Sequence, residues 1–98
     1  MLNVFFGVLL RMRVKFLNRK RTISAAKHED IVTWMRLNDF ERYKDNQNFM
    51  QAYSDRKKLF EGKIISPDDV DAFVNDLQAH KIIEVSNSGL FVAFRKHT

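Results

Sequence analysis

The chain has 98 residues, 45% of them hydrophobic, which suits one compact domain and is too short for two. It contains no cysteine, and this excludes a disulfide scaffold, a thiolate zinc site, an iron–sulfur cluster and a cysteine nucleophile. Its formal charge is +5, and the excess of basic residues lies at one end. We therefore expect a single domain over 1–98, made of a basic amphipathic segment over 1–27 and a body over 28–98.

The basic segment is the main electrostatic feature. Residues 1–27 hold seven basic residues and no acid, whereas residues 28–98 hold ten basic and twelve acidic residues. A concentrated basic segment attracts polyanions by counterion release, so nucleic acid is the expected partner. A few bases near the C-terminus could assist. The candidate nucleic-acid-binding residues are Arg11, Arg13, Lys15, Arg19, Lys20, Arg21, Lys27, Arg95 and Lys96.

The first seventeen residues permit two secondary structures. Apolar residues at alternate spacings of three and four predict an amphipathic helix over 2–16, and we favour it. A strand over 10–17 is the alternative, because apolar and basic residues alternate there. In either structure the apolar side chains form a stripe on a different face from the basic residues. The size of this stripe predicts an interface, and we expect a homodimer. The stripe consists of Leu2, Phe5, Phe6, Leu9, Met12 and Phe16.

The same segment bears on localisation. The apolar stretch over 4–10 is far shorter than the roughly 20 residues of a spanning helix, so no transmembrane segment is expected. Its basic residues follow the apolar stretch, unlike those of a secretory signal. We expect a cytoplasmic protein. A mitochondrial presequence, which is also Arg-rich and free of acids, stays an alternative.

Two helices are predicted in the middle of the chain. Residues 19–27 are expected to form a basic turn in which Thr22 and Ser24 can cap a helix from about 25 to 38. One face of that helix would carry Ile31, Trp34 and Met35, with Leu37 as a further candidate. After a polar break, a helix over about 46–61 ends at Gly62. Its predicted core face carries Phe49, Met50, Tyr53 and Phe60.

The last third predicts a helix and a hairpin. Ser66, Pro67 and two following acids indicate a helix start, and the helix would run over 67–80. Residues 81–85 and 90–94 are predicted strands joined by a turn at 87–89. Residues 63–65 fit a short third strand or an apolar turn. The buried stripe of the helix would be Val70, Phe73, Val74 and Leu77.

A short helix, a turn, a second helix and a two-stranded hairpin over about 46–96 resemble the winged-helix (winged helix-turn-helix) family in layout. The resemblance implies an α+β, mostly helical fold of three to four helices followed by a C-terminal β-hairpin. It would make Pro67 to His80 the recognition helix and Ile82 to Phe94 the wing.

The chemistry of that helix departs from DNA-binding members of the family. Its predicted solvent face carries two carboxylates, which phosphates would repel, beside two amides. Nucleic-acid affinity would therefore come from the basic segment. This face is instead a candidate protein interface, formed by Asp68, Asp71, Asn75 and Gln78.

Catalytic and metal signals are weak. His28, His80 and His97 lack the spacing of a helical metal pair. The acids at 68, 69 and 71 lack the following glycine and closing glutamate of a calcium loop. We expect no enzyme activity, metal or cofactor.

The sequence thus predicts a small nucleic-acid-associated protein, such as a regulator of transcription or replication, that binds mainly through its basic N-terminal segment. The alternative is a protein–protein interaction module, an adaptor or inhibitor, docking through the acidic helix over 67–80 and the apolar N-terminal stripe. A peripheral membrane-surface protein is the third reading.

Overall fold

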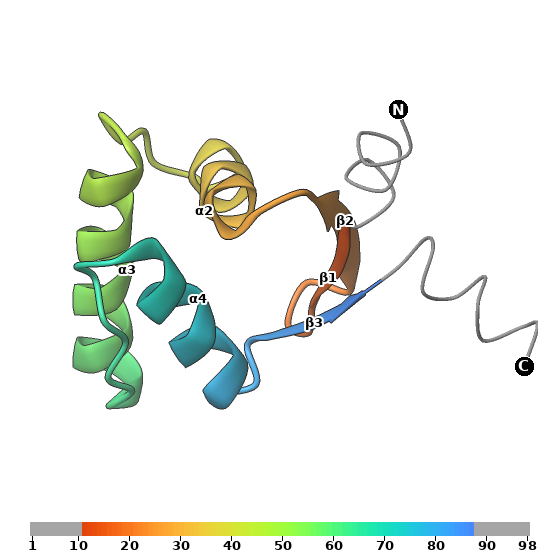
Figure 1. Cartoon of the computed structure of the whole chain (residues 1–98). Coiled ribbons are helices and arrows are strands. Elements are labelled where there is room, and N and C mark those ends of the chain that lie inside the picture. The colour runs from red at the N-terminus through yellow and green to blue at the C-terminus, as the bar shows by residue number, and fades with distance from the viewer. Residues whose placement is uncertain (1–10, 88–98) are drawn as a thin grey trace, which may run out of the picture.

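The computed structural model describes residues 11–87. Within this range a β-hairpin comes first, three helices follow, and a third strand returns to the hairpin (Figure 1). Helices α2 and α4 lie between the sheet and α3, which is the element farthest from the sheet (Figure 1). The elements are β1 Met12–Phe16, β2 Arg21–Ala25, α2 His28–Leu37, α3 Asn46–Glu61, α4 Val70–Ala79 and β3 Ile83–Asn87.

β1 is the central strand of the described sheet, whose order is β2-β1-β3 with both pairings antiparallel. Val14 lies opposite Ile23 on one side and Val85 on the other. Val14 and Phe16 are buried, while the basic residues between them face solvent. The period of two therefore decides the structure here. The favoured helix is wrong for residues 12–16, where the strand alternative is confirmed; its residues 2–10 lie outside the described range.

The second strand corrects another expectation. Residues 21–25 form β2 rather than a basic turn, and the turn of the hairpin covers only residues 17–20. Lys20 closes it with a left-handed backbone, φ 54°. Thr22 and Ser24 are exposed on β2 and do not cap the next helix. Asp30 does so, because its Oδ2 accepts the backbone N–H groups of Ala26 and Lys27 at 3.0 and 3.2 Å.

Helix α3 matches the predicted range, whereas α2 begins three residues after the predicted start at about 25 and ends one residue before 38. Asp45 Oδ1 accepts the backbone N–H of Asn48 at 2.8 Å at the start of α3, and Gly62 ends the helix at φ 68°. Ile31 and Met35 of α2 are buried, and Leu37 is exposed. On the predicted core face of α3, three residues are buried, but the fourth, Phe60, is 75% exposed and borders a pocket.

Helix α4 begins three residues later than predicted. Asp69, not Ser66, is the cap, since its Oδ2 accepts the backbone N–H of Ala72 at 3.0 Å. Pro67 lies before the helix, where its carbonyl oxygen accepts the side-chain N–H of Gln47 at 2.8 Å. The predicted buried stripe is largely confirmed. Phe73, Val74 and Leu77 are fully buried, and Val70 is partly buried.

The order of strands and helices differs from the predicted layout. The observed hairpin, β1 and β2, precedes the helices, whereas the sequence placed a hairpin after them. The strand predicted over 81–85 exists as Ile83–Asn87, but it pairs with β1. The strand predicted over 90–94 lies outside the described residues. Residues 63–65 form no strand, although Ile65 is buried.

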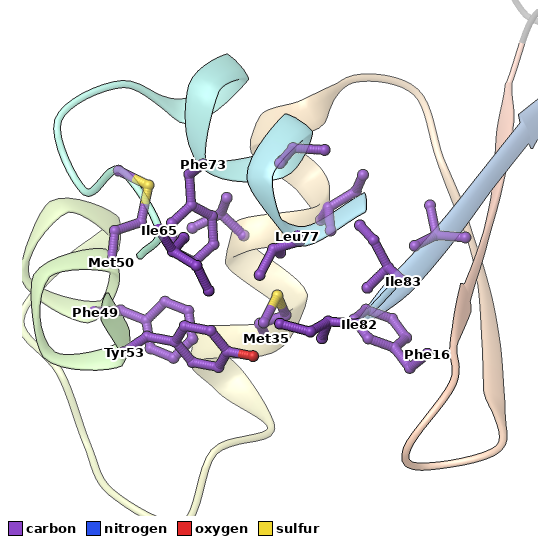
Figure 2. Packing of buried hydrophobic residues seen from close by; sticks show 14 of the residues in the cluster. Phe16, Met35, Phe49, Met50, Tyr53, Ile65, Phe73, Leu77, Ile82 and Ile83 are labelled. Atoms are coloured by element: carbon purple, nitrogen blue, oxygen red, sulfur yellow. The ribbon is translucent and has the colours of Figure 1, made fainter. Parts of the chain in front are cut away.

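One hydrophobic cluster joins the sheet and the helices (Figure 2). The Phe73 ring lies edge-on to Phe49 and Tyr53 of α3, with centroids 6.4 and 5.6 Å away. At the sheet, Phe16 stacks on Trp34 at 4.7 Å between centroids. Such contacts add to the burial of apolar area. The basic hairpin is therefore anchored in the same core as the helices.

Candidate nucleic-acid interface

The outer face of the sheet carries basic and hydroxyl side chains. The register places Arg13 between Ser24 and Ser86, and Lys15 between Thr22 and Glu84. All of these residues are exposed, because the opposite face of each strand is turned to the core. This surface is called the outer sheet face below, and it comprises Arg13, Lys15, Thr22, Ser24, Glu84 and Ser86.

Arg11 extends the basic surface at the start of β1. Its Nε donates to Ser24 Oγ at 2.8 Å, and its Nη2 donates to the Ser24 carbonyl oxygen at 3.3 Å. These bonds hold the guanidinium against β2, beside the outer sheet face.

The other bases of the hairpin lie elsewhere. Arg19 and Arg21 are placed over the ring of Trp34, with guanidinium carbons 5.8 and 5.6 Å from its centroid. Lys20 is exposed in the turn, and Lys27 is exposed before α2. Of the predicted binding residues that the structure describes, one group therefore lies on or beside the sheet face and another near the turn, while Lys27 lies apart from both at the start of α2. Arg95 and Lys96 lie outside the described residues.

The predicted acidic interface of α4 is partly engaged within the chain. Asp71 Oδ1 lies 2.7 Å from Nδ1 of His28, which joins α4 to the first turn of α2. Asp68 and Asn75 are exposed, and Gln78 is half-buried. Of the predicted apolar stripe, Met12 is partly buried and Phe16 fully buried in the core of this chain. Leu2, Phe5, Phe6 and Leu9 lie outside the described residues.

A pocket of about 350 Å³ opens beside the hairpin turn, where α2 and α3 approach it. Sequence reasoning missed it, because its walls come from segments far apart in the chain. Its single clue was Phe60, an aromatic residue at the end of a helix that the prediction assigned to the core. We call it the Asp39 pocket; it is lined by Phe16, Asn18, Arg19, Met35, Asp39, Phe40, Tyr53, Arg56, Lys57, Phe60, Glu61 and Ile82.

Asp39 is the most unusual residue of this pocket. Its side chain is 5% exposed, and its Oδ2 accepts no hydrogen bond from the described residues. Arg56 Nη1 is 3.7 Å from that oxygen, within ion-pair range but too far for a hydrogen bond. Burying a carboxylate oxygen without a hydrogen-bond donor costs free energy, so a donor brought to this oxygen would be stabilising.

Tyr43, Glu41 and Arg56 form a polar network around Asp39. Arg56 Nη1 donates to the Tyr43 hydroxyl at 3.2 Å, and that hydroxyl donates to Glu41 Oε1 at 3.1 Å. Burial raises the pKa of Tyr43 most, followed by the interaction of its hydroxyl with the Asp39 carboxylate and then with Glu41, against the lowering effect of Arg56. Burial lowers the pKa of Arg56, but its hydrogen bond to Tyr43 and the charge of Asp39 outweigh this, so the net pKa is raised.

The opposite wall combines a buried phenol with paired charges. Burial, and then the charge of Glu61, raise the pKa of Tyr53 to about 12 against the opposing charges of Arg56 and Arg19. Glu61 accepts from Lys57 at 2.8 Å and pairs with Lys63 at 3.2 Å, and these bonds lower its pKa. The charged side chains of the lining are three basic and two acidic.

Within residues 11–87, no three histidine or acidic side chains are grouped closely enough to hold a metal ion. The described helices include none that is long and apolar enough to cross a membrane. Comparisons with protein-family models, curated proteins and solved structures find no match to this chain.

Proposed function

We propose that this protein binds nucleic acid through the outer sheet face, mainly by contacts to the phosphate backbone. The observation that carries the proposal is the exposure of Arg13 and Lys15 on the central strand, where Arg13 lies between two serines and Lys15 between Thr22 and Glu84. Lysine, arginine, serine and threonine are among the side chains that bind phosphate oxygens in protein–DNA complexes. The hairpin holds these side chains at fixed spacing, because its other face is packed in the core.

Long-range electrostatics favour the same surface. Residues 11–27 carry all seven bases of the N-terminal segment and no acid, so the hairpin is the strongly positive part of the molecule. Helix α4 has no basic residue within its bounds, and its carboxylates oppose phosphate binding. We therefore do not propose that α4 contacts base edges in the groove of a duplex. Binding to the phosphate backbone alone would be weakly selective for nucleotide sequence.

A protein-binding module is the second candidate function. Its support is a group of large apolar side chains that the fold leaves exposed, more than a single scattered residue would explain. Binding of a second copy or another protein through them would leave the outer sheet face free. They are Leu37, Phe40, Leu59, Phe60 and Ile64.

The double variant Arg13→Gln with Lys15→Gln tests the nucleic-acid proposal. Removing two phosphate contacts should reduce the slope of log affinity against log salt by about two for duplex DNA. The matched control is Arg42→Gln with Lys44→Gln, two exposed bases in the connection between α2 and α3. Its slope should stay near that of the unchanged protein. Equal effects of the two double variants would reject the outer sheet face as the binding surface.

Glu84 allows a test of opposite sign. It is the acid of the outer sheet face and lies across from Lys15 in the register. Glu84→Gln should strengthen binding at low salt, because it removes the repulsion between this carboxylate and a phosphate. Weaker binding by Glu84→Gln would contradict the proposed path of the backbone over the sheet.

A further inference from the structure

We propose that the Asp39 pocket binds one unstacked nucleobase carrying an exocyclic amino group, together with its phosphate, from a single strand held on the basic hairpin. This inference rests on the nucleic-acid function proposed above and adds a second contact of different chemistry. Three features of the pocket support it: a buried acceptor without a donor, two exposed aromatic rings, and cations at the hairpin turn.

The buried acceptor is Asp39. Asp39 lines the pocket, and its enclosed Oδ2 accepts no hydrogen bond from the described residues. Adenine, cytosine and guanine each present an amino group, and a carboxylate is the usual acceptor for the amino group of cytosine. Thymine and uracil present carbonyl oxygens at the corresponding edge, and these would be repelled. The pocket should therefore distinguish amino-bearing bases from thymine.

The exposed rings belong to Phe40 and Phe60, which are 82% and 75% exposed. Both border the pocket, and the guanidinium of Arg56 lies 5.6 Å from the centroid of the Phe40 ring. Aromatic rings left in water beside a polar hollow are suited to stacking on a base, and single-strand-binding proteins use such rings as platforms.

The cations connect the pocket to the hairpin. Arg19 belongs to the turn between β1 and β2 and also lines the pocket. Arg56 and Lys57 lie on the α3 wall, and Glu61 is already paired with Lys57 and Lys63. With three basic and two acidic side chains, the pocket lining has an excess of positive charge. A phosphate attached to the bound nucleobase would lie near Arg19, on the side of the pocket that leads to the other basic residues of the hairpin.

The size of the pocket limits what enters it. About 350 Å³ falls at the lower end of small-molecule sites, which is enough for one base and not for a stacked pair of strands. A base inside a duplex would have to leave its stack first, and this costs free energy. We therefore expect single strands to use the pocket in preference to duplexes.

The first test compares oligodeoxycytidine with oligothymidine of equal length, two pyrimidine strands that differ in the amino group. The unchanged protein should bind the cytidine strand about tenfold more tightly, the effect of a hydrogen bond to a charged acceptor. Asp39→Asn should bring the ratio close to one, because the amide presents a donor as readily as an acceptor. Asp68→Asn removes the same charge from an exposed residue outside the pocket and should keep the ratio.

The second test uses two neighbouring residues of α3. Phe60→Ala should weaken binding of both strands by about tenfold, because it removes a stacking surface. Leu59→Ala is the matched control: Leu59 is 76% exposed and does not line the pocket. Since both side chains are exposed, neither variant should unfold the protein, and this test holds even where Asp39→Asn fails to fold.

The outcomes separate this inference from the proposed function. Arg13→Gln with Lys15→Gln should weaken the binding of both strands and leave the ratio of their affinities unchanged. A ratio near one in the unchanged protein, with a normal salt dependence, would reject the base pocket and leave the outer sheet face standing. No binding of either strand would reject both.

Two further results would also overturn the inference. Deoxycytidine monophosphate bound as tightly as the strand would assign the pocket to a free nucleotide. A dimer that Phe60→Ala dissociates, with strand binding unaffected, would assign the rings to a second copy of this chain.

Discussion

The carboxylate of Asp76 in α4 accepts the backbone N–H of Ser66 at 2.8 Å. Ser66 is half-buried in the connection between α3 and α4, directly after the buried Ile65. This bond fastens the connection to the side of α4. It also gives a structural role to an acid that lies too far along the helix to be explained by capping.

Replacing Asp76 should therefore destabilise the fold. We expect Asp76→Ala to lower the free energy of unfolding by about 1–2 kcal/mol, because a partly buried N–H loses its acceptor. Asp76→Asn should cost less, since the amide oxygen can still accept. Asp68→Ala, at an exposed acid, should change stability by less than about 0.5 kcal/mol. Chemical denaturation of the three variants checks this, and equal losses for Asp68 and Asp76 would contradict it.

The ends of α3 and α4 offer a matched pair of substitutions. Both ends carry a left-handed residue: Gly62, the cap of α3, at φ 68°, and Lys81, one residue beyond the cap of α4, at φ 59°. Ile82 N–H bonds the Leu77 carbonyl, five residues back, at 2.9 Å, and Lys63 N–H bonds the Lys57 carbonyl, six residues back, at 3.2 Å, so each end closes with a bond to a carbonyl of its helix. The left-handed position holds glycine after α3 and lysine after α4.

We expect Lys81→Gly to stabilise the protein by about 0.5–1 kcal/mol, because glycine adopts positive φ without the Cβ clash. Gly62→Ala should destabilise it by about 1 kcal/mol, although no atom lies within 4 Å of the added Cβ. Thermal melting of both variants provides the measurement. A loss of stability in Lys81→Gly would show that the lysine side chain matters more than its backbone strain.

Ser54 is a buried hydroxyl in α3 whose Oγ has no hydrogen-bond partner among the described residues. Ser54→Ala removes this unsatisfied group and introduces a better helix former. The free energy of unfolding should rise by up to about 1 kcal/mol in chemical denaturation. A decrease of similar size would mean that the hydroxyl is satisfied in solution.

Tyr53 gives the stability an alkaline dependence. Its pKa rises from 10.0 to about 12 on folding, so the folded protein keeps the phenol proton to higher pH than the unfolded chain does. The unfolded state therefore releases this proton first, and stability should fall between pH 10 and about 12 by up to about 3 kcal/mol. In Tyr53→Phe the fall should be smaller. Denaturation midpoints across this pH range, with tyrosinate absorbance, test it, and an identical fall in both proteins would contradict it.

The helices were predictable from local signals. Asp45 and Gly62 bracket α3, and the spacing from Val70 to Leu77 identifies the buried face of α4, because caps and periodicity act within a few residues. The start of α4 was misplaced, since Ser66 and Asp69 are both suitable caps and only the folded arrangement selects Asp69.

The sheet and the Asp39 pocket depend on contacts between distant residues. Met12 and Phe16 fit both a helical and a strand period, and pairing with Ile83 to Asn87 is what selects the strand. Likewise Asp39, Phe60 and Arg19 carry no common sequence signal, and they meet only because the hairpin turn lies against α2 and α3. The basic residues of the outer sheet face were identified from charge. The sequence did not show that Arg19 and Arg21 lie apart from them, over Trp34.

The central position of β1 has a consequence for the order of folding. β1 can pair with β2 as soon as the short turn forms, but β3 comes from the far end of the described chain, after all three helices. Closing so long a loop costs more entropy and is slow compared with hairpin formation. A growing chain would thus expose the apolar side of the hairpin, with Val14 and Phe16, throughout synthesis of the helices. During that interval the open edge of β1 is the place where wrong strand pairing between nascent chains would begin.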